Sequence, residues 1–262
     1  MKYPQITISL TSISGRLPAL AGTLRTLLRQ DYPSFRIRLY LSHEPFLLDD
    51  GIRLPPEEIV ALAREDDRLD IRFVPNIGPY RKILPFLAET RGRRCIVATA
   101  DDDTLYPADW LSGLYRAFRA YRCVVCYRGH YMRREGVNFA KYRQWMRNDV
   151  PRNPDLFNLP TGKDGVLYDT SFFDPRVLDY PRALRLASTA DDLWLKWHYS
   201  ATNMISTYII NDDYKANTFE HSDPEGGDGL YRSFNKDGGN DATIENLEAY
   251  FKDEFGRSFA SQ

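Results

Sequence analysis

Residues 95–110, CIVATADDDTLYPADW, join an apolar run to three consecutive acids. The run 95–99 has the length and β-branched content of a buried strand. Asp101, Asp102 and Asp103 follow where that strand ends. In an open α/β sheet, ligands bind outside this carboxyl end of the strands. The stretch therefore predicts a strand that delivers three carboxylates to a ligand site.

Three adjacent acids need a positive partner, because like charges raise one another's pKa. A hard divalent cation is a natural partner, since Mg²⁺ takes one or two carboxylates together with water and phosphate oxygens. Capping of the helix predicted after Pro107 would explain one of the acids but not three. We therefore predict a metal–phosphate site with Mg²⁺ or Mn²⁺ as the cofactor.

The sequence before this stretch alternates strand and helix patterns. Strands are predicted at 6–10, 37–41, 69–74, 95–99 and 122–127. Helices are predicted at 17–30, from 55–58 onward, at 80–89 and at 107–121. Such alternation is typical of βαβ units, so the fold class is α/β with a mainly parallel central sheet flanked by helices.

The pattern changes after Gly129. Residues 128–160 are polar, aromatic and rich in proline, and we expect an irregular insertion there. A strand at 165–168, a helix at 191–198 and a strand at 206–210 then return to the core. A glycine-rich loop, 226–239, precedes a last helix at 242–251. The length fits a single domain over 1–262.

A second acidic pair, Asp191 and Asp192, opens a predicted amphipathic helix. Acids in a first helical turn are favoured by the helix dipole alone. A carboxylate near a hydroxyl substrate can also act as a general base. Because an acidic ligand site occurs elsewhere in the chain, we favour the second interpretation and take both residues as catalytic candidates.

The segment 76–82, NIGPYRK, places basic residues directly after a predicted strand. Lys82 and Arg81 would suit a diphosphate, one as a point charge and the other as a bidentate fork. A solvated helix start explains the same residues, and both interpretations stay open. His221 is likewise either a surface histidine or a metal ligand from the C-terminal loop.

The insertion is basic and aromatic over residues 128–147. Tyr131, Tyr142 and Trp145 are interleaved with its basic residues, which are Arg128, Arg133, Arg134, Lys141, Arg143 and Arg147. Such a segment can lie on an anionic membrane surface or contact a phosphorylated acceptor. A solvated loop is the alternative, and the sequence does not separate them.

Composition excludes several classes of protein. The net charge of -1 argues against a nucleic-acid partner. GxSxG, Walker A, GxGxxG and HExxH motifs are absent. No apolar run reaches the length of a membrane span. We therefore expect a cytoplasmic protein that can bind peripherally to the inner face of the membrane. Cys123 and Cys126 lie in an apolar run that predicts a buried strand.

Five stretches together resemble a GT-A glycosyltransferase of family 2, a Rossmann-like fold for nucleotide-sugars. They are 6–33 (ITISLTSISGRLPALAGTLRTLLRQDYP), 77–82 (IGPYRK), 100–110 (ADDDTLYPADW), 162–168 (GKDGVLY) and 189–196 (TADDLWLK). The resemblance implies that 1–127 binds the nucleotide-sugar and that 128–262 binds the acceptor.

The resemblance also implies roles for individual residues. The nucleotide contacts would be Leu10, Thr11, Ser12, Arg16, Asn76, Tyr80, Lys82, Asp101 and Asp102. Asp103, with Asp101, would bind the metal, and Gly165 would lie at the acceptor side. Asp192 would be the catalytic base. Because the family usually has Glu-Asp where this chain has Asp191-Asp192, the choice between these two acids is open.

The implied activity is a metal-dependent, inverting transfer of a sugar from a UDP-sugar to a hydroxyl of a glycan or lipid-linked acceptor. The setting it suggests is bacterial surface polysaccharide biosynthesis. One alternative is a sugar-phosphate nucleotidyltransferase, although residues 11–16 hold only one glycine where those enzymes have a glycine-rich loop. The other is a non-catalytic module that binds nucleotides or glycans.

Overall fold

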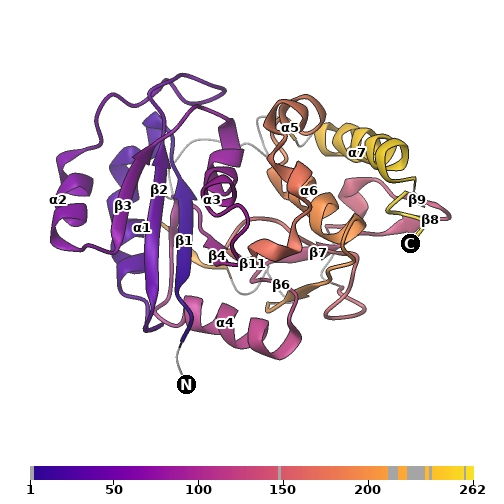
Figure 1. Ribbon diagram of the computed structural model, residues 1–262, viewed down its shortest axis with the longest axis horizontal. Coiled ribbons are helices and arrows are strands. Elements are labelled where there is room, and N and C mark those ends of the chain that lie inside the picture. Colours follow the sequence, from indigo (N-terminus) through magenta and orange to yellow (C-terminus); the bar gives the residue numbers. More distant parts are fainter. Residues whose placement is uncertain (1–2, 147–148, 212–217, 223–233, 236–237, 257) are drawn as a thin grey trace.

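The computed structural model describes residues 3–146, 149–211, 218–222, 234–235, 238–256 and 258–262 (Figure 1). A seven-stranded sheet has the order β12-β6-β11-β4-β1-β2-β3. Its strands are β1 (Ile6–Thr11), β2 (Phe35–Leu41), β3 (Leu69–Phe73), β4 (Ile96–Thr99), β6 (Val124–Cys126), β11 (Val166–Asp169) and β12 (Thr207–Ile209). Only β11 runs antiparallel to its neighbours in this sheet. The predicted α/β class with a mainly parallel sheet is confirmed.

Helices flank the sheet. They are α1 (Leu17–Leu28), α2 (Glu57–Glu65), α3 (Leu84–Glu89), α4 (Trp110–Tyr121), α5 (Tyr180–Leu186), α6 (Asp191–Lys196) and α7 (Gly239–Phe255). Figure 1 shows α5, α6 and α7 gathered on the side of β6, away from α1 and α2. Leucines three or four apart on α1 are buried, which is why this segment forms a helix against the sheet.

Several predicted boundaries are wrong for local reasons. The helix predicted at 80–89 is a 3-10 turn, Gly78–Lys82, followed by α3, because Pro85 fits the first turn of a new helix. The helix predicted from 107 begins at Trp110, whose amide bonds to the carbonyl of Pro107 in a turn. The strand predicted from 122 begins at Val124, because Arg122 ends α4 with φ 55°.

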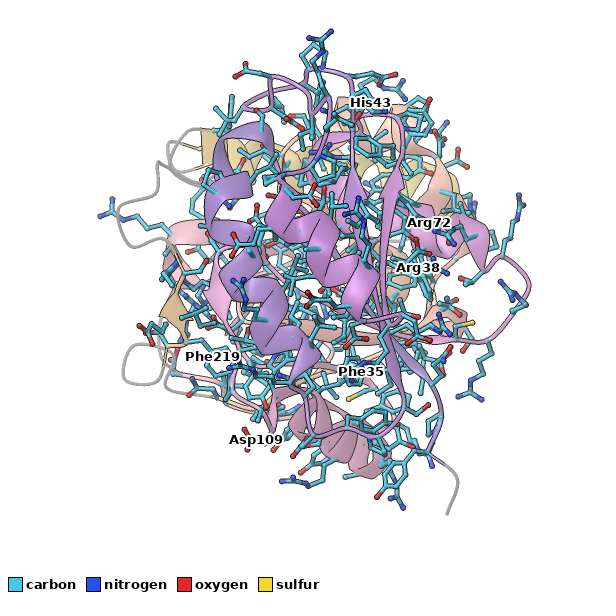
Figure 2. All side chains as sticks on the ribbon, turned by 90° about the vertical axis from the view of Figure 1, so that its left-hand side faces the viewer. Phe35, Arg38, His43, Arg72, Asp109 and Phe219 are labelled. Carbon is cyan, nitrogen blue, oxygen red and sulfur yellow. The ribbon has the colours of Figure 1, made fainter. Side chains whose placement is uncertain are left out.

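The outer face of β2 and β3 carries ion pairs. Arg38 and Arg72 on these neighbouring strands both contact Asp70, and Arg72 also contacts Glu89 at 2.9 Å (Figure 2). Long charged side chains cover this face of the sheet, whereas Ile37 and Leu39 on the opposite face of β2 are fully buried. The alternation of β2 thus points Ile37 and Leu39 into the core, and the other face carries both Arg38 and the fully buried Tyr40.

The segment 128–160 is not the irregular insertion that its composition predicts. It contains β7 (Gly129–Tyr131) paired with β10 (Asn158–Pro160), and a hairpin of β8 (Arg134–Glu135) and β9 (Asn138–Phe139). Its aromatic residues supply a local core, and Trp145 is fully buried.

This packing weakens the expected membrane or acceptor surface. Tyr142 and Trp145 are buried. Arg134 lies over the ring of Phe157, and Lys141 pairs with Glu245. Arg147, also part of that expectation, lies outside the described residues. Among the residues that the structure describes, no helix is long and apolar enough to cross a membrane.

The end of the chain packs back on this segment. The predicted last helix is confirmed as α7, although it is longer than expected. Phe259 follows it and is fully buried, with its ring 5.3 Å from Trp197 and 5.7 Å from Phe139. Most of the glycine-rich loop 226–239 lies outside the described residues. Cys123 and Cys126 are buried and free, as the strand prediction implies.

Candidate active site

A cavity of about 310 Å³ lies at the carboxyl ends of β1, β2, β3 and β4. Loops after these strands form one part of its lining, and residues 161–163, the start of α6 and His221 form the rest. Its acidic residues are Asp101, Asp102, Asp103, Asp191 and Asp192, and its basic residues are Arg16, Arg81, Lys82 and Lys163. The cluster of three aspartates and the Asp191–Asp192 pair therefore line one cavity.

Asp102 is the innermost of the three consecutive acids. Its Oδ2 accepts the Ser12 hydroxyl at 2.6 Å, and its Oδ1 accepts Arg16 Nη1 at 3.0 Å. Burial raises the pKa of Asp102, and the charge of Arg16 opposes that rise. Arg16 also reaches Asp103 Oδ2 at 3.3 Å. Asp102 thus joins the first loop to the acidic cluster.

Lys82 pairs with the first acid of the cluster. Its Nζ lies 2.6 Å from Asp101 Oδ1, and its backbone carbonyl accepts the Ser9 hydroxyl at 2.6 Å. Burial opposes protonation here, yet the charges of Asp101 and Asp191 raise the pKa of Lys82 above its ordinary value. Lys82 therefore carries its charge between the two acidic sites.

Asp191 and Asp192 form the first turn of α6. The fully buried Trp194 fixes this helix, and its Nε1 donates to the carbonyl of Val177 at 3.0 Å. Burial raises the pKa of both aspartates, the charge of Asp191 raises that of Asp192 further, and Lys82 opposes both shifts. A carboxylate whose pKa is raised is a stronger proton acceptor.

His221 reaches the cavity from a separate strand pair. β13 (Glu220–His221) runs antiparallel to β5 (Thr104–Leu105), which directly follows the acidic cluster. The His221 Nε2 lies 2.6 Å from Lys163 Nζ. Long-range pairing, rather than sequence spacing, brings this histidine beside the acids.

The donor set fits a cation that is bound together with phosphate. Within the described ranges, no group of three or more His, Cys, Asp or Glu side chains could hold a metal ion. Mg²⁺ and similar cations need only one or two carboxylates when water and phosphate oxygens complete the shell. Asp101 and Asp103 provide such carboxylates, because both line the cavity.

Three of the predicted nucleotide contacts do not line the cavity. The side chains of Leu10 and Tyr80 are fully buried, and neither residue lines the cavity. Tyr80 instead donates from its hydroxyl to the carbonyl of Ala187 at 2.6 Å, which ties the 78–82 turn to the segment before α6. Asn76 donates to Asp49 Oδ2 at 3.2 Å and supports the neighbouring loop.

The remaining predicted residues line the cavity, namely Thr11, Ser12, Arg16, Lys82, Asp101, Asp102, Asp103, Asp191, Asp192 and His221. Gly165 lies just beyond residues 161–163 with φ 98°, and a Cβ there would come within 2.5 Å of the Trp110 ring. Trp110 also donates to the carbonyl of Asp164 at 2.8 Å. Gly165 therefore lets this loop pack directly on α4.

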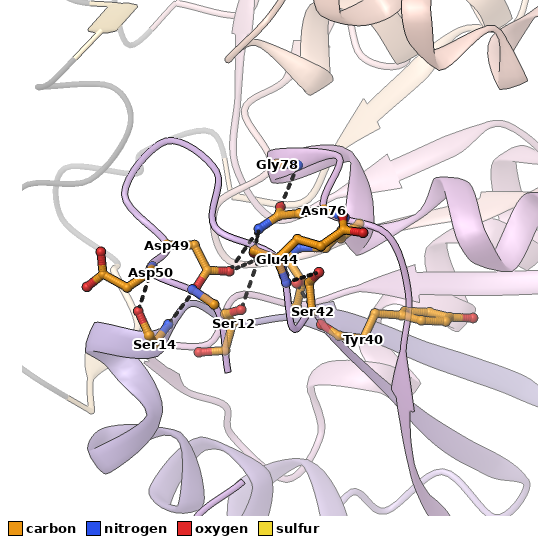
Figure 3. Close-up of polar contacts among 12 residues, drawn as sticks. Ser12, Ser14, Tyr40, Ser42, Glu44, Asp49, Asp50, Asn76 and Gly78 are labelled. Carbon is orange, nitrogen blue, oxygen red and sulfur yellow. Dashed lines mark hydrogen bonds and ion pairs between the residues drawn. The ribbon is translucent and has the colours of Figure 1, made fainter. Parts of the chain in front are cut away.

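Asp49 is a residue that the sequence analysis missed (Figure 3). It forms an ion pair with Arg81 at 2.8 Å, and both side chains are 1% exposed. Its Oδ1 accepts the amides of Ser14 at 3.0 Å and Gly51 at 3.1 Å. The acid thus joins the loops after β1, β2 and β3. The stretch LLDDG at 47–51 shows two adjacent acids in the sequence. It does not show that Asp49 forms a buried ion pair, because that burial depends on tertiary packing.

The fold is that of a GT-A protein, and the two acidic sites line one cavity at the carboxyl ends of its strands. The sequence model of Glycosyl transferase family 2 matches residues 13–176, more than half of the chain, and the chain belongs to this family. No curated protein matches it in sequence.

Solved structures share the fold at low identity. S. aureus TarS 1–349 is 15% identical with a TM-score of 0.51, and the match covers 97% of this chain and 74% of TarS. The 4-diphosphocytidyl-2C-methyl-D-erythritol synthase from Anaerococcus prevotii DSM 20548 is 15% identical with a TM-score of 0.50, covering 95% of this chain and 96% of that one. Both likenesses concern the fold alone.

Proposed function

We propose that this family member is a metal-dependent, inverting glycosyltransferase that moves a sugar from a UDP-sugar to a hydroxyl of a glycan or lipid-linked acceptor. One observation carries the proposal: two acidic sites from distant parts of the chain line one cavity together with four basic residues. Such a cavity can hold a charged diphosphate at one acidic site and a hydroxyl at the other. The family resemblance suggests bacterial surface polysaccharide biosynthesis as the setting.

The charge of the cavity supports metal dependence. Its acidic residues outnumber its basic ones, and Arg81 is already neutralised by Asp49. A diphosphate would add further negative charge, which a divalent cation offsets. Asp103 and Asp101 would hold that cation. When bound, it supplies Lewis-acid stabilisation of charge on the departing nucleoside diphosphate.

The chain's own residues bind the donor and move the proton. Lys82 and Arg16 would bind the diphosphate oxygens, and Asp101 and Asp103 would hold the cation. Asp192 accepts the proton of the acceptor hydroxyl while its oxygen forms a bond to the anomeric carbon. The bond from that carbon to the diphosphate oxygen breaks on the opposite face, so the configuration inverts. This arrangement parallels inverting glycosidases, where two groups act on opposite faces.

Binding of a panel of nucleoside diphosphates and UDP-sugars, with and without Mn²⁺, tests the donor site. We expect thermal stabilisation that needs both UDP and Mn²⁺, by about 2.7 kcal/mol at a hundredfold excess over Kd. Lys82→Met should weaken UDP binding by roughly tenfold to a hundredfold, because a charge-assisted hydrogen bond is lost. Asp109→Asn is the matched control, since Asp109 is an exposed residue that does not line the cavity (Figure 2).

Product analysis separates the proposed reaction from its alternatives. Release of UDP from a UDP-sugar upon addition of an acceptor supports glycosyl transfer. Release of pyrophosphate from a nucleoside triphosphate and a sugar phosphate would identify a nucleotidyltransferase instead. Tight UDP-sugar binding without turnover of any acceptor would favour a non-catalytic module.

A further inference from the structure

A tight hairpin turn lies at the rim of the cavity, between β2 and α2. Phe46 N–H donates to Asp49 O at 2.8 Å, and Asp49 N–H donates to Phe46 O at 3.0 Å. Leu47 and Leu48 are therefore the two central residues of the turn. Leu47 has φ 54°, a left-handed conformation that such turns usually reserve for Gly, Asn or Asp. We call these two residues the Leu47–Leu48 turn.

A bulky residue in this conformation is an outlier that the surrounding structure must impose. The neighbouring Gly78 helps, because a Cβ there would lie 3.0 Å from the Phe46 ring and 3.4 Å from Leu47 Cδ1. The Asp49 network shown in Figure 3 fixes the base of the turn. Glycine would relieve the strain, so the leucine side chain itself needs an explanation.

Asp49 has no free acceptor position. Its Oδ1 accepts the amides of Ser14 and Gly51, and its Oδ2 accepts Arg81 Nη2 and Asn76 Nδ2. A carboxylate offers about four acceptor positions. The acid of this loop is consequently a support for the turn and cannot also accept a hydrogen bond from a ligand.

The turn faces the apolar end of a two-ended cavity. Leu47 and Leu48 are each 41% exposed, and both line the cavity with Ile13, Phe46 and Pro79. These residues belong to the loops after β1, β2 and β3. The carboxylates of the acidic cluster follow β4, which lies on the other side of β1 in the strand order. Under the proposed function, a ligand that reaches both ends has an apolar group and an anionic group that is held with a cation.

We infer that the Leu47–Leu48 turn is a preformed apolar surface on which the nucleobase of the donor packs. The base is then recognised by contact area and shape, and the Asp49 carboxylate accepts no hydrogen bond from the base. The inference rests on the proposed function, because it assumes that the diphosphate of the same donor lies at the acidic end.

The test compares UDP with inorganic pyrophosphate by titration calorimetry in the presence of Mn²⁺. Leu47→Gly should weaken UDP binding about tenfold, because one leucine's contact with the base is lost. Pyrophosphate binding should not change, since the acidic end is intact. The melting temperature should stay the same or rise, because glycine adopts a positive φ without strain. Leu48→Ala should also weaken UDP binding selectively.

Leu54→Gly is the matched control, because Leu54 is 82% exposed in the same connection and does not line the cavity. It should change neither affinity. Unchanged UDP binding in both Leu47→Gly and Leu48→Ala would overturn the inference, as would an equal loss of pyrophosphate binding. Failure of the proposed function has a different signature, in which the unaltered protein binds no nucleoside diphosphate at all.

Discussion

Residues 3–127 and the described part of 128–262 are held together in different ways. The first part repeats strand and helix, and β1 pairs in parallel with β2 over six residue pairs. The second part has strands of two to four residues, one of them reversed in the main sheet. Aromatic contacts such as those of Phe259 join its pieces. Regular pairing thus builds one side of the cavity, and side-chain packing builds the other.

The two parts also contribute different groups to the cavity. Residues 3–127 supply Arg16, Lys82 and the acidic cluster, whereas the second part supplies the Asp191–Asp192 pair and Lys163. If this difference is functional, donor binding and proton transfer should respond separately to substitutions. The following predictions test that separation, from the largest expected effect to the smallest.

Asp192→Asn should lower kcat by about 10²–10⁴-fold, the usual contribution of a positioned general base. UDP affinity should remain within about twofold, because the groups proposed to hold the diphosphate lie in the other part of the chain. Steady-state kinetics and calorimetry on Asp192→Asn and Asp191→Asn together would identify the base. A loss of UDP affinity as large as the loss of kcat would contradict the proposed separation of donor binding from proton transfer.

Phe259→Ala should lower the free energy of unfolding by about 3–5 kcal/mol, because a fully buried ring is removed from an aromatic cluster. Urea denaturation measures this change. Val137→Ala, at a residue 70% exposed in the same part of the chain, should change stability by less than about 0.5 kcal/mol. Equal effects would contradict the role of aromatic packing in the second part.

The pH dependence of activity should have an acidic limb displaced above the ordinary pKa of an aspartate. Burial raises the pKa of Asp191 and Asp192, so the base loses its charge as pH falls through the raised value. The unfolded chain ionises these groups at lower pH than the folded protein does. The two carboxyl groups therefore lower the free energy of unfolding progressively as pH rises from about 4 through the raised pKa.

Asp192→Asn tests the predicted direction of this dependence of stability on pH. The variant should be more stable than the unaltered protein at neutral pH, and the difference should shrink as pH falls toward 4. Thermal unfolding across this range measures it. A variant that is less stable at every pH would show that Asp192 supports the fold rather than being retained for its charge.

Arg25→Ala should have the smallest effect. Arg25 Nη2 pairs with Glu58 at 2.6 Å between α1 and α2, and both side chains are about half exposed. Exposed ion pairs contribute about 0–1 kcal/mol to stability. Urea denaturation should detect at most a slight loss, with no change in UDP binding. A larger loss would mean that regular pairing is not enough to hold the first part together.

Much of the first part was predictable because its signals are local. Leucines at helical spacing placed α1, and an apolar run followed by acids placed β4 and the cluster. Strand direction then follows from short βαβ connections. Lys82 could be named because its segment directly follows a predicted strand, whereas Arg16 was named from the family resemblance.

The second part was less predictable because its residues depend on distant partners. Trp145 appeared in a basic, polar segment, yet it is fully buried. Tyr142, in the same segment, is also buried. No local pattern reports such contacts, since a tyrosine or tryptophan has the same spacing at a surface and in a core.

The sequence by itself determined the fold class, the family resemblance and the two acidic sites, because strand periodicity and runs of like charge are properties of neighbouring residues. Only the tertiary structure decided which of these residues meet. Asp49 and Arg81 are thirty-two positions apart, and Lys163 and His221 fifty-eight, yet each pair is in contact. Burial and long-range pairing set those contacts, and they depend on the packing of the whole chain.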